Sequence, residues 1–220
     1  MSIGDAEIKT QERVIRFFKD PEILGYQYIG NLSDQQNKNI KEDRLRQYLR
    51  LKGYADKLID AAVMQLHQEA GNLSRGVYDA NKTVYSRLKY GIPVSESPEK
   101  PPVTVELIDE TNPLNNDFAI AEEVTVVEQQ EKRPDLVIYL NGIAVAVIEL
   151  KRSSISVSEG IRQNLTNQKD SFIRGFFTTM QFCMAGNESE GLRYGTLLTG
   201  EKFYMEWKDD GFKEHEEERD

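Results

Sequence analysis

Cysteine and histidine are scarce in this sequence, and their scarcity removes several kinds of site. The single cysteine among the 220 residues, Cys183, lies in an apolar segment. No internal disulfide can form, and a buried, inert thiol is expected. The two histidines, His67 and His215, stand far apart among unrelated surroundings. A zinc site or a histidine-based catalytic triad is therefore not expected.

Long hydrophobic runs are also missing. No stretch is long enough to cross a membrane, and the opening MSIGDAEIKT has no apolar signal core. Hydrophobic residues make up 39% of the chain and charged residues 30%, a composition typical of globular proteins with ample length for a core. Together with the lone cysteine, this predicts a cytoplasmic protein that has no membrane partner.

Positive charge is in the minority, since the sequence has 28 Lys and Arg and 37 Asp and Glu, which gives a net charge of −9. Residues 209–220 hold seven acids and two bases and account for −5 of that total. This balance argues against simple electrostatic capture of nucleic acid. A DNA enzyme with this composition needs a local basic patch, a metal, or partner subunits that hold the DNA.

Hydrophobic periodicity divides the chain into a helical part and a sheet part. Apolar residues at helical spacing predict four helices in the first ninety residues: Thr10–Lys19, Asn39–Lys52, Asp56–Ala70 and Asp79–Tyr90. A linker-like stretch, SESPEKPP, follows at Ser95–Pro102. Beyond it we expect further strands at Val103–Ile108, Phe118–Val127, Phe176–Met184, Leu192–Leu198 and Lys202–Trp207. The predicted units are a helical region 1–94, a core 103–208 and, at 209–220, either an acidic tail or the start of a linker to a further domain.

The segment Arg133–Arg152, RPDLVIYLNGIAVAVIELKR, organises the rest of the chain because it predicts a central β-hairpin. Leu136–Leu140 and Ile143–Leu150 are two Val- and Ile-rich runs, and Asn141-Gly142 between them is a strong hairpin signal. Both runs are apolar at odd and even positions, so both faces of the sheet should be covered. With Val103–Ile108 and Phe118–Val127, the hairpin predicts a four-stranded meander.

Three charged residues stand at the open end of this hairpin: Asp135, Glu149 and Lys151. Burying such groups is costly unless they are paired or bind a metal. Glu149 and Lys151 share a face, because residues two apart on a strand point the same way. A two-residue loop would pair Pro134 with Glu149 and turn Asp135 to the opposite face. If the three charges form a site, a three-residue loop is predicted, with Asp135 across from Val147.

Two carboxylates and a lysine at one end of a sheet suit phosphodiester hydrolysis. Asp135 and Glu149 are hard oxygen ligands for Mg²⁺, which keeps waters and a substrate phosphate in its shell. The ion would lower the pKa of a bound water and neutralise charge on the phosphate. Lys151 would orient or deprotonate that water, or stabilise the pentavalent state. Taken alone, however, Pro-Asp is a common strand entry and Glu-x-Lys is often a solvated strand end.

The arrangement resembles the PD-(D/E)xK nuclease motif: Pro134-Asp135, a hairpin, then Glu149-Leu150-Lys151. In that superfamily the backbone carbonyl of the middle residue, here Leu150, often binds the metal as well. Glu12, early in the first predicted helix, is either a further acid for the metal or a solvated charge near a helix N-terminus.

The helix after the hairpin makes the resemblance more specific. Ser156 with Glu159 predicts a capping box that opens a helix to about Phe172. Gln163 and Asn167 share a face of it. Several segments together resemble the N-terminal nuclease domain of type I restriction enzyme R subunits: RPDLVIYLNG, AVIELKRS, IRQNLTNQKDSF, MAGNESEGLRYGTLLTG, LKGYADKLIDAA and NKTVYSRLKYGIPV.

This resemblance implies an α/β restriction-endonuclease-like fold, with a mixed central sheet flanked by helices and a helical N-terminal extension. It implies Mg²⁺-dependent cleavage of double-stranded DNA in which Asp135, Glu149, Lys151 and Gln163 are catalytic. Many R subunits carry a tyrosine four residues after the glutamine, where this chain has Asn167. Asn167 therefore has either an altered role or lies on an ordinary exposed helix face.

The predicted DNA contacts are the basic residues around the same helix, Arg152, Arg162 and Lys169. No groove-reading motif is present, so sequence recognition should belong to a specificity subunit, with a methylation subunit as a further partner.

The family's R subunit continues into an ATP-driven translocase whose motifs are not found here. GTLLTGEK at Gly195–Lys202 departs from a phosphate-binding loop, because Glu201 separates Gly200 from Lys202, and it is interpreted as a strand and turn. ATP hydrolysis would belong to the missing motor. Two other interpretations remain: a non-catalytic docking module with this fold, and repair or transposon machinery that reads DNA structure.

Overall fold

Val- and Ile-rich runs form the centre of a seven-stranded mixed sheet in the computed structural model, which describes residues 3–97 and 99–208. Strands β1 and β4 are parallel, as are β8 and β9, and the other neighbours are antiparallel. The predicted mixed α/β fold is confirmed. In spatial order the strands are β1 (Gln27–Asn31), β4 (Phe118–Glu122), β7 (Leu136–Leu140), β8 (Ile143–Leu150), β9 (Phe182–Asn187), β10 (Gly191–Gly195) and β11 (Met205–Glu206).

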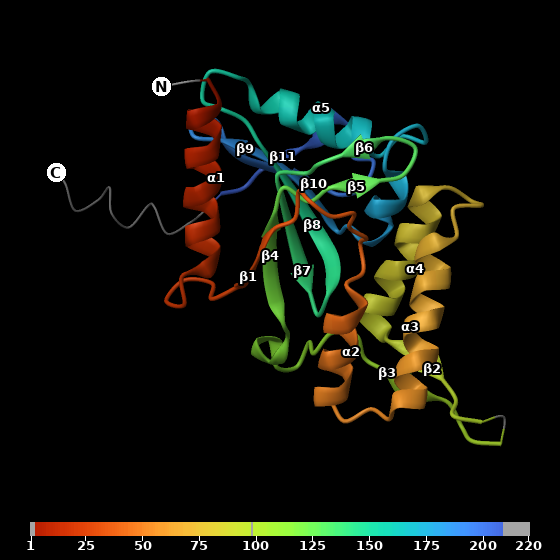
Figure 1. The fold of residues 1–220 in the computed structure, drawn as a ribbon. Helices are drawn as coiled ribbons and strands as arrows, with labels where there is room; N and C mark the ends of the chain where they lie inside the picture. The colour runs from red at the N-terminus through yellow and green to blue at the C-terminus, as the bar shows by residue number, and fades with distance from the viewer. Residues whose placement is uncertain (1–2, 98, 209–220) are drawn as a thin grey trace.

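Helices cover both faces of this sheet, which explains why its central strands are apolar on both sides (Figure 1). Helix α1 (Ile3–Lys19) packs Ile15 against one face, in a cluster with Ile120, Leu136 and Ile148. Helix α5 (Val157–Asn167) and the 3₁₀ helix η2 (Arg174–Thr179) cover the other face. The hairpin β7–β8 therefore lies between two apolar layers.

A second core belongs to the helices α2 (Glu42–Leu51), α3 (Asp56–Gly71) and α4 (Val77–Tyr90). It includes the two-stranded sheet of β2 (Ile92–Val94) and β3 (Val103–Val105), which pair across the predicted linker. This helical core is joined to the sheet at Ile143, which forms a bridge with Ile40 and packs into the helical cluster. The short elements η1 (Pro113–Asn115), β5 (Val126–Val127), β6 (Glu131–Lys132) and η3 (Glu201–Phe203) complete the described fold.

Several predicted elements are shifted by contacts that local sequence does not reveal. Strand β1 lies within the part predicted to be helical, and β3 pairs with β2 instead of joining the meander, which therefore has only β4, β7 and β8. Helix α1 begins at Ile3, so Thr10 is not its cap; its hydroxyl donates to Glu188 Oε1 at 3.1 Å. Helix α5 ends at Asn167, before the predicted Phe172.

The predicted strand Phe176–Met184 is a 3₁₀ helix followed by β9, because Phe176 and Phe177 are buried under the sheet and do not continue it. The segment Gly195–Lys202 contains the end of β10 and a turn, as predicted, but its last two residues begin the 3₁₀ helix η3.

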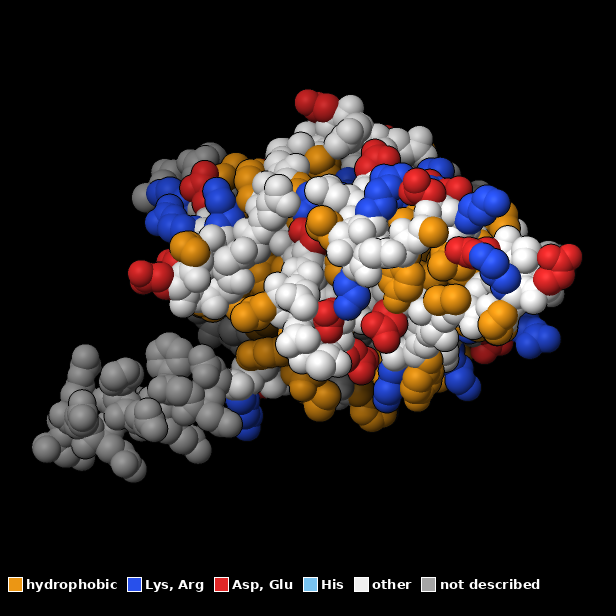
Figure 2. Space-filling model, turned by 90° about the horizontal axis from the view of Figure 1, so that it is seen from below, with side chains coloured by type: hydrophobic (Ala, Val, Ile, Leu, Met, Phe, Trp, Pro, Cys, Tyr) orange, Lys and Arg blue, Asp and Glu red, His pale blue; other side chains and the backbone are white. Residues whose placement is uncertain are grey.

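Helix α1 leaves part of its sheet face open. A groove of about 860 Å³ lies between α1 and the strands, with Phe17, Phe182 and Trp207 in its lining. Among the described residues, no helix is long and apolar enough to cross a membrane. In the view from below, hydrophobic side chains lie along one margin, while cationic and anionic side chains are interspersed over the face (Figure 2).

Candidate active site

The turn of the central hairpin differs from the predicted three-residue loop. Leu140 pairs directly with Ile143, so the loop has two residues. Asn141 and Gly142 have φ angles of 51° and 81°, as a type I′ turn requires, and this turn matches the right-handed twist of the strands. The three-residue loop is therefore wrong, and the turn alone would place Asp135 on the face opposite Glu149.

A β-bulge in β8 returns Asp135 to the same face as Glu149. Tyr139 pairs with Ala144 but Ile138 pairs with Ala146, which leaves Val145 as an extra residue in β8. The Val145 carbonyl accepts a hydrogen bond from the Gln181 backbone N–H at 2.7 Å. After the bulge Leu136 pairs with Ile148, and the next position sets Asp135 opposite Glu149. The two carboxylates thus lie on the same face of the sheet, as the proposed site requires.

Glu149 is the buried acid of this pair, with none of its surface exposed. Its Oε2 accepts a hydrogen bond from Gln163 Nε2 at 2.6 Å, while Oε1 is buried and has no hydrogen-bond partner. Burial raises the pKa of Glu149 well above its usual value, and the neighbouring Asp135 charge raises it further, against the opposing effect of Lys151. A cation bound here would offset both unfavourable terms.

Hydrogen bonds at the end of β8 hold both Asp135 and Lys151 in place. Asp135 Oδ2 accepts a hydrogen bond from the Leu150 backbone N–H at 2.6 Å. The Lys151 backbone N–H donates to the Gly186 carbonyl at 2.9 Å, which fixes the end of β8 against β9. The Lys151 ammonium donates to the Leu150 carbonyl at 3.0 Å. The expected third metal ligand, the Leu150 carbonyl, therefore has a cationic group beside it and a second lone pair remaining.

Helix α5 approaches the sheet closely enough for Gln163 to reach Glu149. The predicted cap is confirmed at Ser156, whose side chain accepts from the Ser158 N–H at 3.3 Å. One turn along, Gly160 faces the strands: a Cβ there would lie 2.9 Å from the Ala185 Cβ and 3.5 Å from the Glu149 Cβ. The missing side chain at Gly160 is what allows this spacing.

The amides that follow on α5 face the protein interior. Asn164 Nδ2 donates to the Met184 carbonyl at 2.8 Å, and Gln168 Oε1 accepts from the Leu198 N–H at 2.7 Å. Asn167 is only 2% exposed, so its interpretation as an ordinary exposed helix face is wrong. Asn and Gln are usually surface residues, so the burial of these amides is not apparent from the sequence.

Helix α1 reaches the same end of the sheet through a residue that the sequence did not single out. Glu12 is exposed, whereas its neighbour Gln11 is buried and donates to Glu122 Oε2 at 2.9 Å and to Glu123 Oε1 at 3.3 Å. Glu123 has a left-handed φ of 52°, its backbone N–H donates to the Asp135 carbonyl, and its charge helps to raise the pKa of Glu149. The sequence offered no signal for Glu123, because its proximity depends on the pairing of β4 with β7.

The predicted basic group is less available than the sequence suggests. Arg162 lies between two carboxylates, 2.7 Å from Glu159 and 2.9 Å from Glu201. Lys169 is exposed and Arg152 partly exposed. Part of the positive charge expected for DNA is thus already neutralised within the protein.

The residues present fit a hard divalent cation with an incomplete protein shell. Among residues 3–97 and 99–208, no group of three or more His, Cys, Asp or Glu side chains is arranged to hold a metal ion. Two carboxylates and one backbone carbonyl are nevertheless the kind of set that Mg²⁺ uses when water and substrate phosphate fill the other positions. The unpartnered Glu149 Oε1 points to the same need for a cation.

Comparison with known proteins identifies the family of this chain. A Staphylococcus saprophyticus type I restriction enzyme SsaAORF53P endonuclease subunit is 29% identical over 112 residues, which cover 49% of this chain and 12% of the relative. A Methanocaldococcus jannaschii protein, provisionally named the endonuclease subunit of type I restriction enzyme MjaIXP, is 28% identical over 122 residues. These residues cover 51% of this chain and 12% of the relative. The matched part is thus a small share of these relatives. The family model of the type I restriction enzyme R protein N terminus matches residues 7–203, and the chain belongs to this family.

Proposed function

We propose that this chain is a Mg²⁺-dependent DNA endonuclease whose active site has the PD-(D/E)xK arrangement. The observation that carries the proposal is the pair Asp135 and Glu149 on one face, with a buried Glu149 oxygen that has no partner and Lys151 beside it. The endonuclease subunits among the relatives support the same reaction class. Magnesium would supply an activated water and neutralise charge on the phosphate.

Each side chain then has a distinct task. Asp135, Glu149 and the Leu150 carbonyl hold the ion, and Gln163 orients Glu149 through the hydrogen bond to Oε2. Lys151 orients the water or stabilises charge on the phosphate. The oxygen of water adds to phosphorus as the bond from phosphorus to the leaving sugar oxygen breaks, and the proton that the water gives up is balanced by the proton that the leaving oxygen takes from solvent.

From the family resemblance we also propose that this domain works within a longer subunit and a larger assembly. This domain would act with an ATP-driven motor in the same subunit and with methylation and specificity subunits that recognise the DNA. The competing proposal is a non-catalytic docking module, which needs no metal at Asp135.

Metal binding and DNA nicking by the purified chain test the proposal. Calorimetry with Mn²⁺ should detect weak binding in the wild type and none in Asp135→Asn, because two carboxylates leave much of the shell to water. The matched control is Glu122→Gln, an acid at the same strand end whose carboxylate binds Gln11 and Tyr28 on the α1 side. Equal Mn²⁺ binding in wild type and Asp135→Asn would place the metal elsewhere.

Lys151→Ala separates catalysis from docking. It should abolish nicking and leave Mn²⁺ affinity largely unchanged, because an ammonium acts on water or phosphate and is not a ligand. In the assembled enzyme the same variant should still form the complex and hydrolyse ATP. Cleavage that survives Lys151→Ala, or fails only when assembly fails, would favour the docking module.

A further inference from the structure

The exposed face of α4 carries an alternating series of lysines and tyrosines. Tyr78, Lys82, Tyr85 and Lys89 follow one another at intervals of four, three and four residues. At 3.6 residues per turn they fall within an arc of about 60° on the helix. Tyr78 and Tyr85 are 58% and 48% exposed, and both lysines are exposed. We call these four residues, with Arg75 just before the helix, the α4 stripe.

The cations of the α4 stripe differ from several other cations of this acidic protein, which are held in ion pairs. Arg44, Arg87 and Arg162 are each engaged by a carboxylate. In the described part of the chain, by contrast, neither Arg75, Lys82 nor Lys89 makes an ion pair. The opposite face of α4 packs into the core through Val77, Ala80, Val84 and Leu88, so this orientation is fixed.

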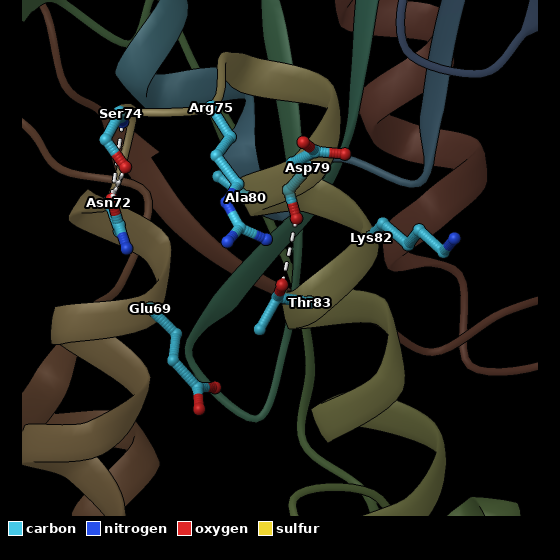
Figure 3. Close-up of a pocket in the computed structure, with 8 residues that line it drawn as sticks. All are labelled: Glu69, Asn72, Ser74, Arg75, Asp79, Ala80, Lys82 and Thr83. Carbon is cyan, nitrogen blue, oxygen red and sulfur yellow. Dashed lines mark hydrogen bonds between the residues drawn. The ribbon is translucent and has the colours of Figure 1, made fainter.

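One end of the stripe borders an open polar pocket of about 490 Å³ between α3 and α4. Figure 3 shows Arg75 reaching into it and Lys82 extending from the next turn of α4, while the Asp79 carboxylate points away from both. Asn72, Ser74, Thr83 and Glu69 also line the pocket, where the Ser74 hydroxyl donates to Asn72 Oδ1 and the Thr83 hydroxyl to the Asp79 carbonyl. The stripe thus ends in a concave surface whose cationic groups are Arg75 and Lys82.

The same end of α4 is connected to the active-site end of the sheet. Val77 packs in one cluster with Val124 and Val126. The Val124 backbone N–H donates to the Pro134 carbonyl at 3.0 Å, directly before Asp135. The first turn of α4 and the segment that follows β4 thus belong to the same apolar cluster.

We propose that the α4 stripe binds the phosphate backbone of double-stranded DNA and guides the duplex toward the active site. This inference rests on the proposed function, because it takes the nuclease substrate as its ligand. Lysine and arginine neutralise phosphates, and tyrosine hydroxyls donate hydrogen bonds to phosphate oxygens, which are sequence-independent contacts. Unpaired cations lose no internal ion pair when they bind, whereas Arg162 would have to leave Glu159 and Glu201.

The test measures anisotropy of a labelled DNA duplex with the 220-residue chain in EDTA at several salt concentrations. Lys82→Ala/Lys89→Ala should weaken binding about tenfold and lower the slope of log K against log salt by about 2, since each phosphate contact contributes about 0.9. The control, Arg50→Ala/Lys100→Ala, removes the same charge from two cations that are ion-paired to Asp56 and Glu96. Tyr85→Phe should have a smaller effect in the same direction.

The outcomes separate this inference from the nuclease proposal. Equal affinity and slope in stripe variant and control, or no duplex binding by the wild type at low salt, would overturn the role of the stripe. Stripe-dependent binding without any Mg²⁺-dependent cleavage would support the stripe and refute the chemistry. When cleavage is present, the stripe variant should raise KM and leave kcat unchanged, because none of its residues touches Glu149.

Discussion

The two ends of the β7–β8 hairpin bury polar side chains in opposite ways. At the turn, Asn141 is completely buried and fully hydrogen-bonded: Nδ2 donates to the Leu107 carbonyl and to Asn116 Oδ1, both at 2.8 Å, and Oδ1 accepts from the Asp117 N–H at 2.7 Å. These bonds tie the segment before β4 to the turn. Asn141 therefore stabilises the fold.

At the open end, Glu149 is equally buried but has an unpartnered oxygen and an acidic neighbour. A buried polar group without its hydrogen bonds lowers stability, and such groups persist at functional sites. The comparison shows that burial alone does not distinguish a structural polar residue from one proposed to be catalytic. The distinction lies in whether its hydrogen-bonding capacity is satisfied within the chain.

The largest expected effect is on cleavage, at the open end of the hairpin, where Glu149 Oε1 has no hydrogen-bond partner. Glu149→Gln should reduce Mg²⁺-dependent cleavage by a factor on the order of 10³, as expected when an essential charge stabiliser is lost. It should also leave the metal-free protein at least as stable as wild type, because it removes a buried charge. Cleavage rates and urea unfolding check both parts, with Glu188→Gln as a control at the same end. A rate close to that of wild type would refute the proposed site.

At the turn of the hairpin, where Asn141 is fully hydrogen-bonded, a substitution should affect the stability of the fold. Asn141→Ala should lower the free energy of unfolding by about 3 kcal/mol, because it loses three hydrogen bonds and places alanine at a positive φ. Asn141→Gly keeps the backbone conformation accessible and should cost about 1 kcal/mol less. Urea midpoints measure both. If Asn141→Ala were as stable as wild type, the contrast between the two ends would fail.

The spacing between α5 and the sheet offers a finer test. Alanine in place of a helical glycine normally stabilises by up to about 1 kcal/mol. Here Gly160→Ala should instead destabilise by about 1–3 kcal/mol, because its Cβ meets the Ala185 methyl, and it should slow cleavage by moving Gln163. The double variant Gly160→Ala/Ala185→Gly should recover cleavage relative to Gly160→Ala. Absence of recovery would mean that α5 tolerates the methyl in another way.

The smallest expected effect is a pH dependence of stability. The pKa of Glu149 is raised in the folded protein, so folding takes up a proton. Its contribution is fully present below the unfolded pKa and is lost as pH rises through the folded pKa, with a slope of at most about 1.4 kcal/mol per pH unit. In EDTA, the stability advantage of Glu149→Gln over wild type should therefore grow from pH 5 to pH 8. A constant difference would contradict the raised pKa.

Local sequence was enough to predict the hairpin, since β7 and β8 begin and end at the predicted residues. It also identified Ser156 as the cap of α5 and placed Asp135 and Glu149 on one face. The reason for that shared face was wrong, because the bulge at Val145 depends on Gln181 and on packing against the helical core. Glu123, the strand β1 and the burial of Asn167 likewise depend on partners distant in sequence, which no local pattern encodes.

The proposed catalytic groups all lie within residues 135–163, and this has a consequence for folding. A β-hairpin forms in about 1–10 μs, and a short segment has little loop-closure entropy to overcome. The two strands can therefore pair through local contacts, whereas the bulge that sets Asp135 opposite Glu149 also uses Gln181, which reaches β8 only after the chain has crossed over through α5. The mutual repulsion of the two acids opposes this later step, and a divalent cation bound as proposed would favour the closing of the sheet as well as the proposed reaction.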